Sequence, residues 1–475
     1  MTEGKALKEA QTIAAVAPKA SSRGPYGGYH KRAVPAEDAE LTHSGPGTPC
    51  GEFMRRFWQP VALSQELKDL PVALNVLGEE LVAFRDLAGR VGVLHRHCAH
   101  RGASLEFGKI ADRGLRCCYH GWLFDVDGTI LDTPGEPETS RIKDTNCQGA
   151  YPAVEAAGLV FAYMGPPELK PAFPLYDTLN LPGTRLVPYA LSHPCNWLQV
   201  HENLMDPLHA VFLHSRMGST QITAAWGEMP VTEWGVLGDR MYYLTSRRLG
   251  DHVWVRFNEV ITPNFGQVGG FWEHGDREQL FVRVSATRWT VPNDDRSSTI
   301  FGVRHFSDEV EPPGIGQGNP DEVGREKLDV YGQTSARPYE EMQRNPGDWE
   351  AMVSQRPIAV HALETRGSTD AGVAMLRRQL RRAIRQVAEG QSHQPLRTAS
   401  ADGTVPTWTS NTILRIPERA GVDDRAVLRE VGRRVRDAVI AADELAGPAR
   451  LTKIRTGLAT IPGELLAFNT PQAVE

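Results

Sequence analysis

Two short segments of the chain combine cysteine and histidine side chains at spacings that suit metal binding. They read Cys98-Ala99-His100 and Cys117-Cys118-Tyr119-His120, with sixteen residues between them. Each is flanked by a glycine, Gly102 or Gly121, which lets a loop turn tightly and lets its backbone approach a bound group. Thiolates and neutral imidazoles are ligands for iron and zinc. We therefore expect two loops that face one metal centre.

A later segment contains Asp206, His209 and His214. Two imidazoles and one carboxylate on a single face of Fe(II) leave the other coordination positions open for O2. Side chains five residues apart on a regular helix point about 140° away from each other. His209 and His214 can therefore share one metal only if the helix ends or bulges between them. Asp206 and His209 are three residues apart and share a helix face.

The first cluster has more than one chemical interpretation. Six cysteines in 475 residues do not make a disulfide scaffold. A zinc site with two cysteines and two histidines is possible, although Cys-x-His is an unusual zinc spacing. In a Rieske [2Fe–2S] centre, two thiolates bind one iron and two imidazoles bind the other, which raises the reduction potential. The spacing favours the Rieske centre over zinc.

Together the two segments resemble the motifs of Rieske non-haem iron oxygenases, in the phthalate dioxygenase-like branch of their alpha (catalytic) subunits. Gly121-Trp122 matches the end of the Rieske motif, and Glu202-Asn203 matches the residues before the iron-binding histidines. The resemblance implies a cluster held by Cys98, His100, Cys117 and His120, and a mononuclear Fe(II) held by His209 and His214. Cys118 is expected to be a buried spare thiol, and His95 and His97 to be structural.

By the same resemblance, Asp206 would bridge the Rieske centre of one subunit to the iron of the next, and Asn203 would lie near the iron. The third iron ligand would be Asp348, with Glu350 and Asp370 as rivals. After Pro346-Gly347, however, Asp348 could instead cap a helix.

The resemblance also implies partners and a reaction class. Electrons from NAD(P)H would arrive through a separate reductase, with or without a ferredoxin, because no G-x-G-x-x-G fingerprint is found here. The enzyme would be a homotrimer, or a multiple of one, that hydroxylates or O-demethylates an acidic aromatic molecule in the breakdown of aromatic compounds. Arg216, Arg256 and Arg283 are candidates to bind the acid. A Rieske electron carrier without oxygenase activity, a zinc-stabilised binding module and an oxygenase of non-aromatic substrates are the alternatives.

The elements expected to carry these residues give an α+β protein. Residues 1–45, rich in Ala, Gly, Pro and Ser, are interpreted as an arm, possibly flexible. Short alternating runs predict an all-β Rieske domain over 46–165. Residues 166–475 are expected to form the catalytic domain, an antiparallel sheet flanked by helices of the helix-grip (START-like) type. Its predicted parts include a helical stretch over 196–215, a Pro- and Gly-rich loop over 309–326, and helices over 370–389 and 423–446.

Composition excludes several other classes of protein. Hydrophobic residues make up 41% and charged residues 23% of the chain, as in ordinary globular proteins. The net charge of −6 and the lack of a basic patch argue against nucleic-acid binding. No apolar run is long enough to span a membrane, and the N-terminus lacks a signal-peptide pattern. A cytoplasmic location is the resulting expectation.

Overall fold

The computed structural model describes residues 25–310, 318–391, 400 and 402–468. Residues 25–38, together with Val360–Thr365, form a small unit of their own. Within it, His361 Nδ1 lies 3.5 Å from Asp38 Oδ2. All other residues belong to one larger unit, which contains every metal-ligand candidate.

The N-terminal part of the larger unit is built from short antiparallel strands. The strands are β1 (Trp58–Leu63), β2 (Val72–Val76), β3 (Glu79–Arg85), β4 (Val91–His95), β5 (Lys109–Ile110), β6 (Leu115–Arg116), β7 (Leu123–Phe124), β8 (Ile130–Asp132), β9 (Ala150–Tyr151), β10 (Ala153–Ala156) and β11 (Leu159–Tyr163). They form three sheets, in the orders β2-β3-β4-β9, β5-β6-β7-β8 and β1-β11-β10. The Asp125–Thr129 turn between β7 and β8 needs Gly128 because its φ is +87°.

A large antiparallel sheet forms the centre of the C-terminal part, with strand order β12-β19-β18-β16-β15-β14-β13. The strands are β12 (Arg185–His193), β13 (Val231–Leu237), β14 (Arg240–Leu249), β15 (His252–Ile261), β16 (Phe265–Gly269), β17 (Gln279–Val282), β18 (Val284–Asp294), β19 (Ser297–Phe306) and β20 (Ser410–Arg415). Strand β20 pairs with β15 and β17. The expected fold class, a Rieske β domain followed by an antiparallel sheet with helices, is confirmed.

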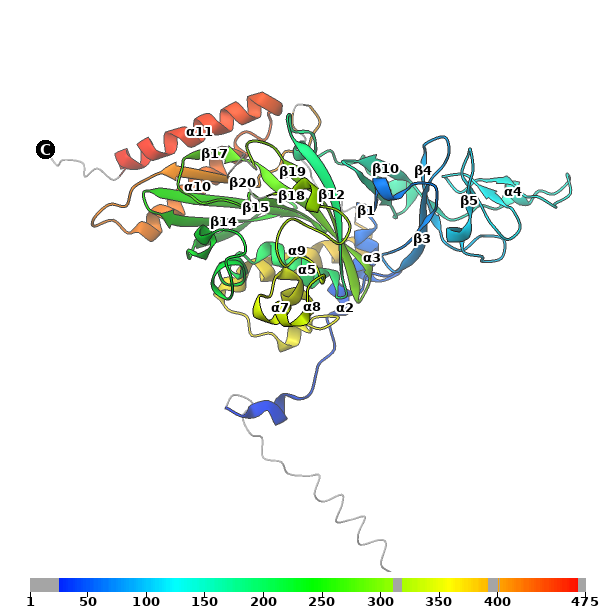
Figure 1. Ribbon diagram of the computed structural model, residues 1–475, viewed down its shortest axis with the longest axis horizontal. Helices are drawn as coiled ribbons and strands as arrows, with labels where there is room; N and C mark the ends of the chain where they lie inside the picture. Colours follow the sequence, from blue (N-terminus) through cyan, green and yellow to red (C-terminus); the bar gives the residue numbers. More distant parts are fainter. Residues whose placement is uncertain (1–24, 311–317, 392–399, 401, 469–475) are drawn as a thin grey trace, which may run out of the picture. The chain divides into compact units, whose positions relative to one another are not determined.

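Helices cover the two faces of this sheet, except for α4 (Ile142–Thr145), which contacts β8 in the N-terminal part. They are α2 (Ala39–Thr42), α3 (Pro49–Met54), α4 (Ile142–Thr145), α5 (Trp197–Glu202), α6 (His209–Val211), α7 (Tyr339–Arg344), α8 (Asp348–Val353), α9 (Ala371–Ala388), α10 (Asp424–Ile440) and α11 (Gly447–Phe468). Helices α5, α7, α8 and α9 gather on one side of the strands, and α11 lies on the other (Figure 1). Helix α10 buries Val427, Val431, Val435 and Val439, the face that the sequence predicted.

One expectation needs correction. The helical stretch over 196–215 is interrupted, because α5 passes into the 3-10 helix η6 (Asn203–Met205) and then into a turn at Asp206 and Pro207 before α6 begins. Within the Pro- and Gly-rich loop, residues 311–317 lie outside the described residues, and η9 (Pro320–Glu322) forms a short 3-10 helix.

Candidate metal centres and substrate pocket

The two Cys/His loops have the same backbone conformation and the same pattern of backbone hydrogen bonds. The N–H of Gly102 donates to the carbonyl of Cys98 (2.8 Å), and the N–H of Gly121 donates to the carbonyl of Cys117 (3.1 Å). Both glycines adopt the left-handed conformation, with φ of +76° and +73°, which other residues rarely adopt. Each loop therefore turns back on its cysteine and presents the neighbouring histidine.

Among the four candidate cluster ligands, the two thiols lie next to each other and the two imidazoles lie next to each other. The Cys98 and Cys117 thiols are hydrogen-bond neighbours, and the rings of His100 and His120 have centroids 4.5 Å apart. Two thiols side by side and two imidazoles side by side match the division of ligands between the two irons of a Rieske cluster. A single tetrahedral zinc would need all four groups around one point. The donor set therefore fits the [2Fe–2S] group.

Neighbouring side chains hold the loops in place. The His100 ring stacks on Trp122 with centroids 4.5 Å apart and planes 3° apart. The buried amide of Gln148 accepts from the Ala99 N–H (2.7 Å) and donates to the carbonyls of His95 (2.8 Å) and His97 (3.0 Å). Sequence reasoning missed Gln148, which no spacing identifies. The expected burial of Cys118 is wrong, because this thiol is exposed.

The second candidate centre brings together His209, His214 and Asp348. Asp348 Oδ1 lies 3.6 Å from His209 Nε2 and 3.4 Å from His214 Nε2. One ligand atom from each residue lies within 4.8 Å of the others, the only such group of three or more His, Cys, Asp or Glu residues in the described part of the chain. Two imidazoles and one carboxylate, converging from one side, fit Fe(II) with open positions.

The backbone between the two histidines explains how they converge. Residues Phe212–Arg216 form the π-helix η7, which follows α6 directly. The wider turn brings side chains five residues apart onto one face, and the two rings lie 5.5 Å apart. The five-residue spacing required the helix to end or bulge between the two histidines, and the π-helix provides that bulge.

Hydrogen bonds at the other ring nitrogen orient each histidine. His209 Nδ1 donates to the backbone carbonyl of Asp206, and His214 Nδ1 donates to Gln221 Oε1 at 2.9 Å. Gln221 is held in turn by donation to the carbonyl of Pro346 (2.8 Å). With Nδ1 protonated, the Nε2 lone pair of each ring faces the Asp348 carboxylate, as a metal ligand requires.

The carboxylate of Asp348 is buried and well supported. Gln333 Nε2 donates to its Oδ2 (2.7 Å) and Asn203 Nδ2 donates to its Oδ1 (3.1 Å). Burial alone would raise the pKa of Asp348, but the nearby His214 and His209 hold it well below its usual range. Burial alone would lower the pKa of His214, but Asp348 raises it above its usual value.

The rivals of Asp348 are engaged elsewhere. Asp348 is the first residue of α8, whose N-cap is Gly347 rather than Asp348. Glu350 accepts from the Gly347 N–H (2.7 Å) and pairs with Arg337. Asp370 accepts from the Gly367 N–H (2.6 Å) at the start of the 3-10 helix η11 (Ser368–Asp370), just before α9. Both rival carboxylates are thus used to cap helices.

Asn203 and Asp206 flank this centre in different ways. Asn203 Nδ2 lies 3.2 Å from His209 Nε2, and Arg288 Nη2 donates to Asn203 Oδ1 (3.2 Å), which fixes the orientation of the amide. Asp206 is partly exposed, and its Oδ2 lies 3.9 Å from His209 Nδ1. Its Oδ1 accepts from the Leu208 N–H (3.1 Å). Asp206 thus connects the candidate iron ligand to the protein surface.

A pocket opens on the three candidate ligands. Its volume is about 80 Å³, and its walls come from alternate residues of three strands: Tyr243, Thr245 and Arg247 of β14, Arg256 and Asn258 of β15, and Ala286 and Arg288 of β18. This alternation follows from the two-residue period of a strand. Trp226 and Phe271 also line the pocket.

Two of the pocket arginines are buried without an acidic partner. Arg247 donates to the Glu228 carbonyl (3.0 Å) and to Thr245 Oγ1 (3.0 Å), and Arg256 donates to the Gly270 carbonyl (2.8 Å). Neither forms an ion pair with a carboxylate of the described residues. Burial lowers the pKa of Arg247 to about 9 and that of Arg256 to about 10. The pocket therefore holds two guanidinium groups without a directly paired carboxylate, although Glu273 near Arg256 and Glu228 near Arg247 act to raise their pKa values.

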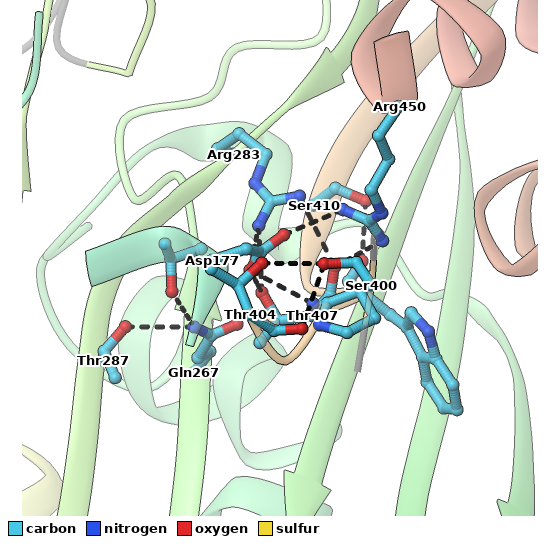
Figure 2. A network of polar contacts seen from close by, with 12 residues as sticks. Asp177, Gln267, Arg283, Thr287, Ser400, Thr404, Thr407, Ser410 and Arg450 are labelled. Atoms are coloured by element: carbon cyan, nitrogen blue, oxygen red, sulfur yellow. Dashed lines mark hydrogen bonds and ion pairs between the residues drawn. The ribbon is translucent and has the colours of Figure 1, made fainter. Parts of the chain in front are cut away.

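The other two arginine candidates lie elsewhere. Arg216 is exposed and does not line the pocket. Arg283 donates to Asp177 Oδ1 (2.9 Å) inside a buried polar network with Arg450 and Thr407, which Figure 2 shows. The sequence could not distinguish arginines that line the pocket from arginines that lie elsewhere, because the direction of each side chain depends on strand register.

Comparison with known proteins agrees with this geometry. Residues 57–147 match the Rieske [2Fe-2S] domain family. The chain is 47% identical over 440 residues to the tert-butanol monooxygenase / tert-amyl alcohol desaturase oxygenase subunit of Aquincola tertiaricarbonis, covering 88% of this chain and 93% of the relative. It is 36% identical over 393 residues to phenoxybenzoate dioxygenase subunit alpha of Ectopseudomonas oleovorans, covering 79% and 91%.

A solved structure has the same fold. Dicamba monooxygenase bound to dicamba superposes with a TM-score of 0.56 at 22% identity, covering 71% of this chain and 99% of that one. The chain belongs to the Rieske non-haem iron oxygenases and is an oxygenase (alpha) subunit of that family. Among the helices that the structure describes, none is both long and apolar enough to cross a membrane.

Proposed function

We propose that this oxygenase subunit uses O2, and electrons from a separate reductase, to hydroxylate or O-demethylate an acidic aromatic molecule. The convergence of His209, His214 and Asp348 at a pocket lined by two buried arginines without an ion-pair partner among the described residues carries this proposal. We propose the separate reductase because the family contains multicomponent oxygenases, and we expect the electrons to come ultimately from NAD(P)H.

The proposal assigns protein ligands to a [2Fe–2S] cluster and to a mononuclear Fe(II). Cys98 and Cys117 would hold one iron of the [2Fe–2S] cluster and His100 and His120 the other, and the bound cluster supplies single electrons. His209, His214 and Asp348 would hold Fe(II), whose chemistry is O2 activation.

The remaining residues prepare the site. The Asp206 carbonyl and Gln221 fix the protonated nitrogen of each histidine, so that both Nε2 atoms stay available. Asn203, oriented by Arg288, places an amide N–H group beside His209 and Asp348. The apolar side chains of Ile222, Trp226 and Phe271 exclude water from the pocket.

Arg247 and Arg256 would anchor the substrate. A carboxylate bound between them would supply the missing counter-charge, and bidentate guanidinium–carboxylate pairs are strong and directional. The ring would then be oriented away from the arginines, toward the metal ligands. An aromatic substrate needs some movement of the wall, because the cavity of about 80 Å³ is smaller than the roughly 150 Å³ that admits benzene in a protein core.

Asp206 has a proposed role between subunits. Its partly exposed carboxylate lies beside the imidazole of His209, so it could hydrogen-bond a cluster histidine of a second copy. This role requires a closed, head-to-tail ring of copies, for which we propose a trimer or a multiple of one.

A second candidate substrate is an uncharged aliphatic alcohol. The name of the 47% identical relative specifies tert-butanol and tert-amyl alcohol. Such a substrate has no charge to place against Arg247 and Arg256, so the buried arginines favour the acid.

The test pairs a substrate panel with a matched variant. Reduced holoenzyme is offered benzoic and methoxybenzoic acids or tertiary alcohols, and O2 uptake is measured together with product. We expect turnover of an acid, with kcat/KM lowered roughly 10- to 100-fold in Arg256→Met. Turnover of alcohols alone, unaffected by Arg256→Met, would overturn the acidic-substrate proposal and leave the oxygenase assignment standing.

A further inference from the structure

A second cavity lies across the catalytic sheet from the candidate iron ligands. Consecutive residues of β18 separate the two spaces, because Arg288 lines the metal-site pocket and Trp289 lines the second cavity. On β16, Val268 and Phe265 are divided in the same way. Since side chains alternate across a strand, the second cavity faces away from the metal site and is distinct from it.

Seven aromatic rings line the cavity. The rings belong to Phe57, Trp58, Phe161, Phe173, Tyr176, Phe265 and Trp289. Several of them meet edge to face, as Phe161 and Phe265 do against Trp289, with centroids 5.2 and 5.3 Å apart. The cavity volume is about 250 Å³, larger than the roughly 150 Å³ cavity that binds benzene in a protein core. The space therefore accommodates a planar ring with a substituent.

One polar side chain of the wall lacks partners. Arg56 lines the cavity, and its Nε and Nη1 are buried with no hydrogen-bond acceptor. No carboxylate within the described ranges forms an ion pair with it. Other polar groups of the wall are satisfied: Trp58 Nε1 donates to the Pro171 carbonyl (3.1 Å), and Asn264 Nδ2 donates to Gln59 Oε1 (2.7 Å). A buried donor without an acceptor is unfavourable, so an anionic group placed against the Arg56 guanidinium would supply an acceptor that the described residues do not.

Hydrogen bonds and ion pairs hold one part of the cavity wall in place. Residues on either side of the cavity form a short bridge, with Val405 N–H donating to the Leu175 carbonyl (2.8 Å) and Asp177 N–H donating to the Val405 carbonyl (3.0 Å). The Asp177 carboxylate accepts from Arg283 (2.9 Å) and Arg450 (2.9 Å) in the network of Figure 2. A wall fixed in this way lowers the ordering cost of binding.

We propose that this cavity is an accessory binding site for an aromatic monocarboxylate, whose ring packs among the aromatic side chains and whose carboxylate pairs with Arg56. The ligand is defined by its chemistry, a planar apolar body with a single anionic group. The site does not depend on the proposed turnover of an acid at the metal centre.

Equilibrium dialysis of the full-length holoprotein against 2-naphthoate tests the site. Arg56→Met should weaken one class of 2-naphthoate sites roughly 10- to 100-fold. Arg56→Lys, which keeps the charge but not the bidentate geometry, should have an intermediate effect. Uncharged 2-naphthamide should bind this site more weakly than 2-naphthoate, and its affinity should not change in Arg56→Met.

Two further variants separate this cavity from the metal-site pocket. Arg256→Met should leave the Arg56-dependent sites intact, whereas Ala172→Trp, which adds bulk at the cavity wall, should abolish them. The proposal is overturned if 2-naphthoate affinity and stoichiometry are unchanged in both Arg56→Met and Ala172→Trp. It is equally overturned if Arg256→Met removes all binding. The visible spectrum of the cluster shows whether each variant is folded. If Arg56→Met does not fold, the binding of 2-naphthoate to Ala172→Trp decides whether the cavity is the site.

Discussion

Individual hydrogen bonds decide which ring nitrogen of each candidate iron-ligand histidine is free to bind a metal. His214 depends on a side-chain amide, because Gln221 Oε1 is the acceptor at its Nδ1. His209 depends on a backbone carbonyl instead. Only the first of these contacts can be removed by substitution, which makes Gln221 the most informative residue outside the proposed ligands.

We predict that Gln221→Met weakens iron binding about 10- to 100-fold, the usual effect of losing such a supporting contact. Gln221→Glu keeps an acceptor at the same place and should retain iron. The measurement is iron content after titration with a chelator, with the cluster spectrum as internal control. Unchanged iron retention in Gln221→Met would show that the contact does not orient His214.

The sequence identified the residues with distinctive side chains and missed their supports. Cysteine, histidine and aspartate carry metal chemistry: the spacing of the Cys/His pairs predicted a cluster site, and the family resemblance supplied the iron ligands, including Asp348. Gln148, Gln221 and Gln333 were missed because amides bond to whatever lies nearby, and nothing in their spacing marks a role. These supports become visible only when the fold brings distant segments together.

Among the elements, α5 and α9 are joined by a buried ion pair. Glu202, the last residue of α5, accepts from Arg377 of α9 through both carboxylate oxygens, at 2.5 and 2.7 Å. Removing one partner of a buried pair leaves an uncompensated charge, which costs about 3–5 kcal/mol. Asn203 directly follows Glu202, so this pair also fixes the entry to the metal site.

Arg377→Met should therefore lower the free energy of unfolding by about 3–5 kcal/mol, measured by denaturant unfolding. The exposed neighbour Arg378 provides the control, because Arg378→Met should change stability little. Combining Arg377→Met with Glu202→Leu should restore most of the loss, since both charges are then removed. A double variant as unstable as Arg377→Met would contradict the ion-pair explanation.

Strand β15 carries a carboxyl group whose burial makes stability depend on pH. Burial raises the pKa of Glu259 to about 7, although Arg240 opposes the shift. The folded protein then holds a proton that the unfolded chain releases near pH 4.5, so this contribution to stability is lost as pH rises from about 4.5 to 7. The full change is on the order of 2–3 kcal/mol between pH 5 and 8.

Glu259→Gln should remove this dependence. We expect the thermal midpoint of the wild type to fall, relative to that of Glu259→Gln, as pH is raised from 5 to 8. The two proteins should then keep a constant difference above pH 8. Parallel pH profiles of the two proteins would show that Glu259 does not titrate in this range.

Element prediction succeeded where periodicity was strong and failed where it was interrupted. Helices α9 and α10 were predicted because apolar residues recur on one face. The stretch over 196–215 breaks at Pro207, and α11 was missed because Pro462 and several glycines obscure its pattern. The sequence predicted only that the helix must end or bulge between His209 and His214 if both bind one metal. It could not predict the π-helix itself, since residue propensity does not distinguish a π-turn from an α-turn.

For the whole molecule, the proposed role of Asp206 requires electrons to pass between copies of the chain. We predict that Cys98→Ser, which lacks the cluster, and His209→Ala, which lacks the iron, are each inactive alone. Mixing them under conditions of subunit exchange should restore part of the activity, because a cluster in one copy serves an iron in the next. Adding Asp206→Ala to the Cys98→Ser chain should abolish the recovery, and failure to recover without it would favour transfer within one chain.

The central claim is that His209, His214 and Asp348 bind the iron that oxidises substrate, separately from the cluster. Iron and acid-labile sulfide are measured in the anaerobically reconstituted wild type and in His214→Ala, together with the visible spectrum and product formation. We expect roughly three irons and two sulfides per chain in the wild type. His214→Ala should lose one iron and all product but keep the sulfide and the spectrum. Full iron content with normal product in His214→Ala, or zinc without sulfide in the wild type, would contradict the account.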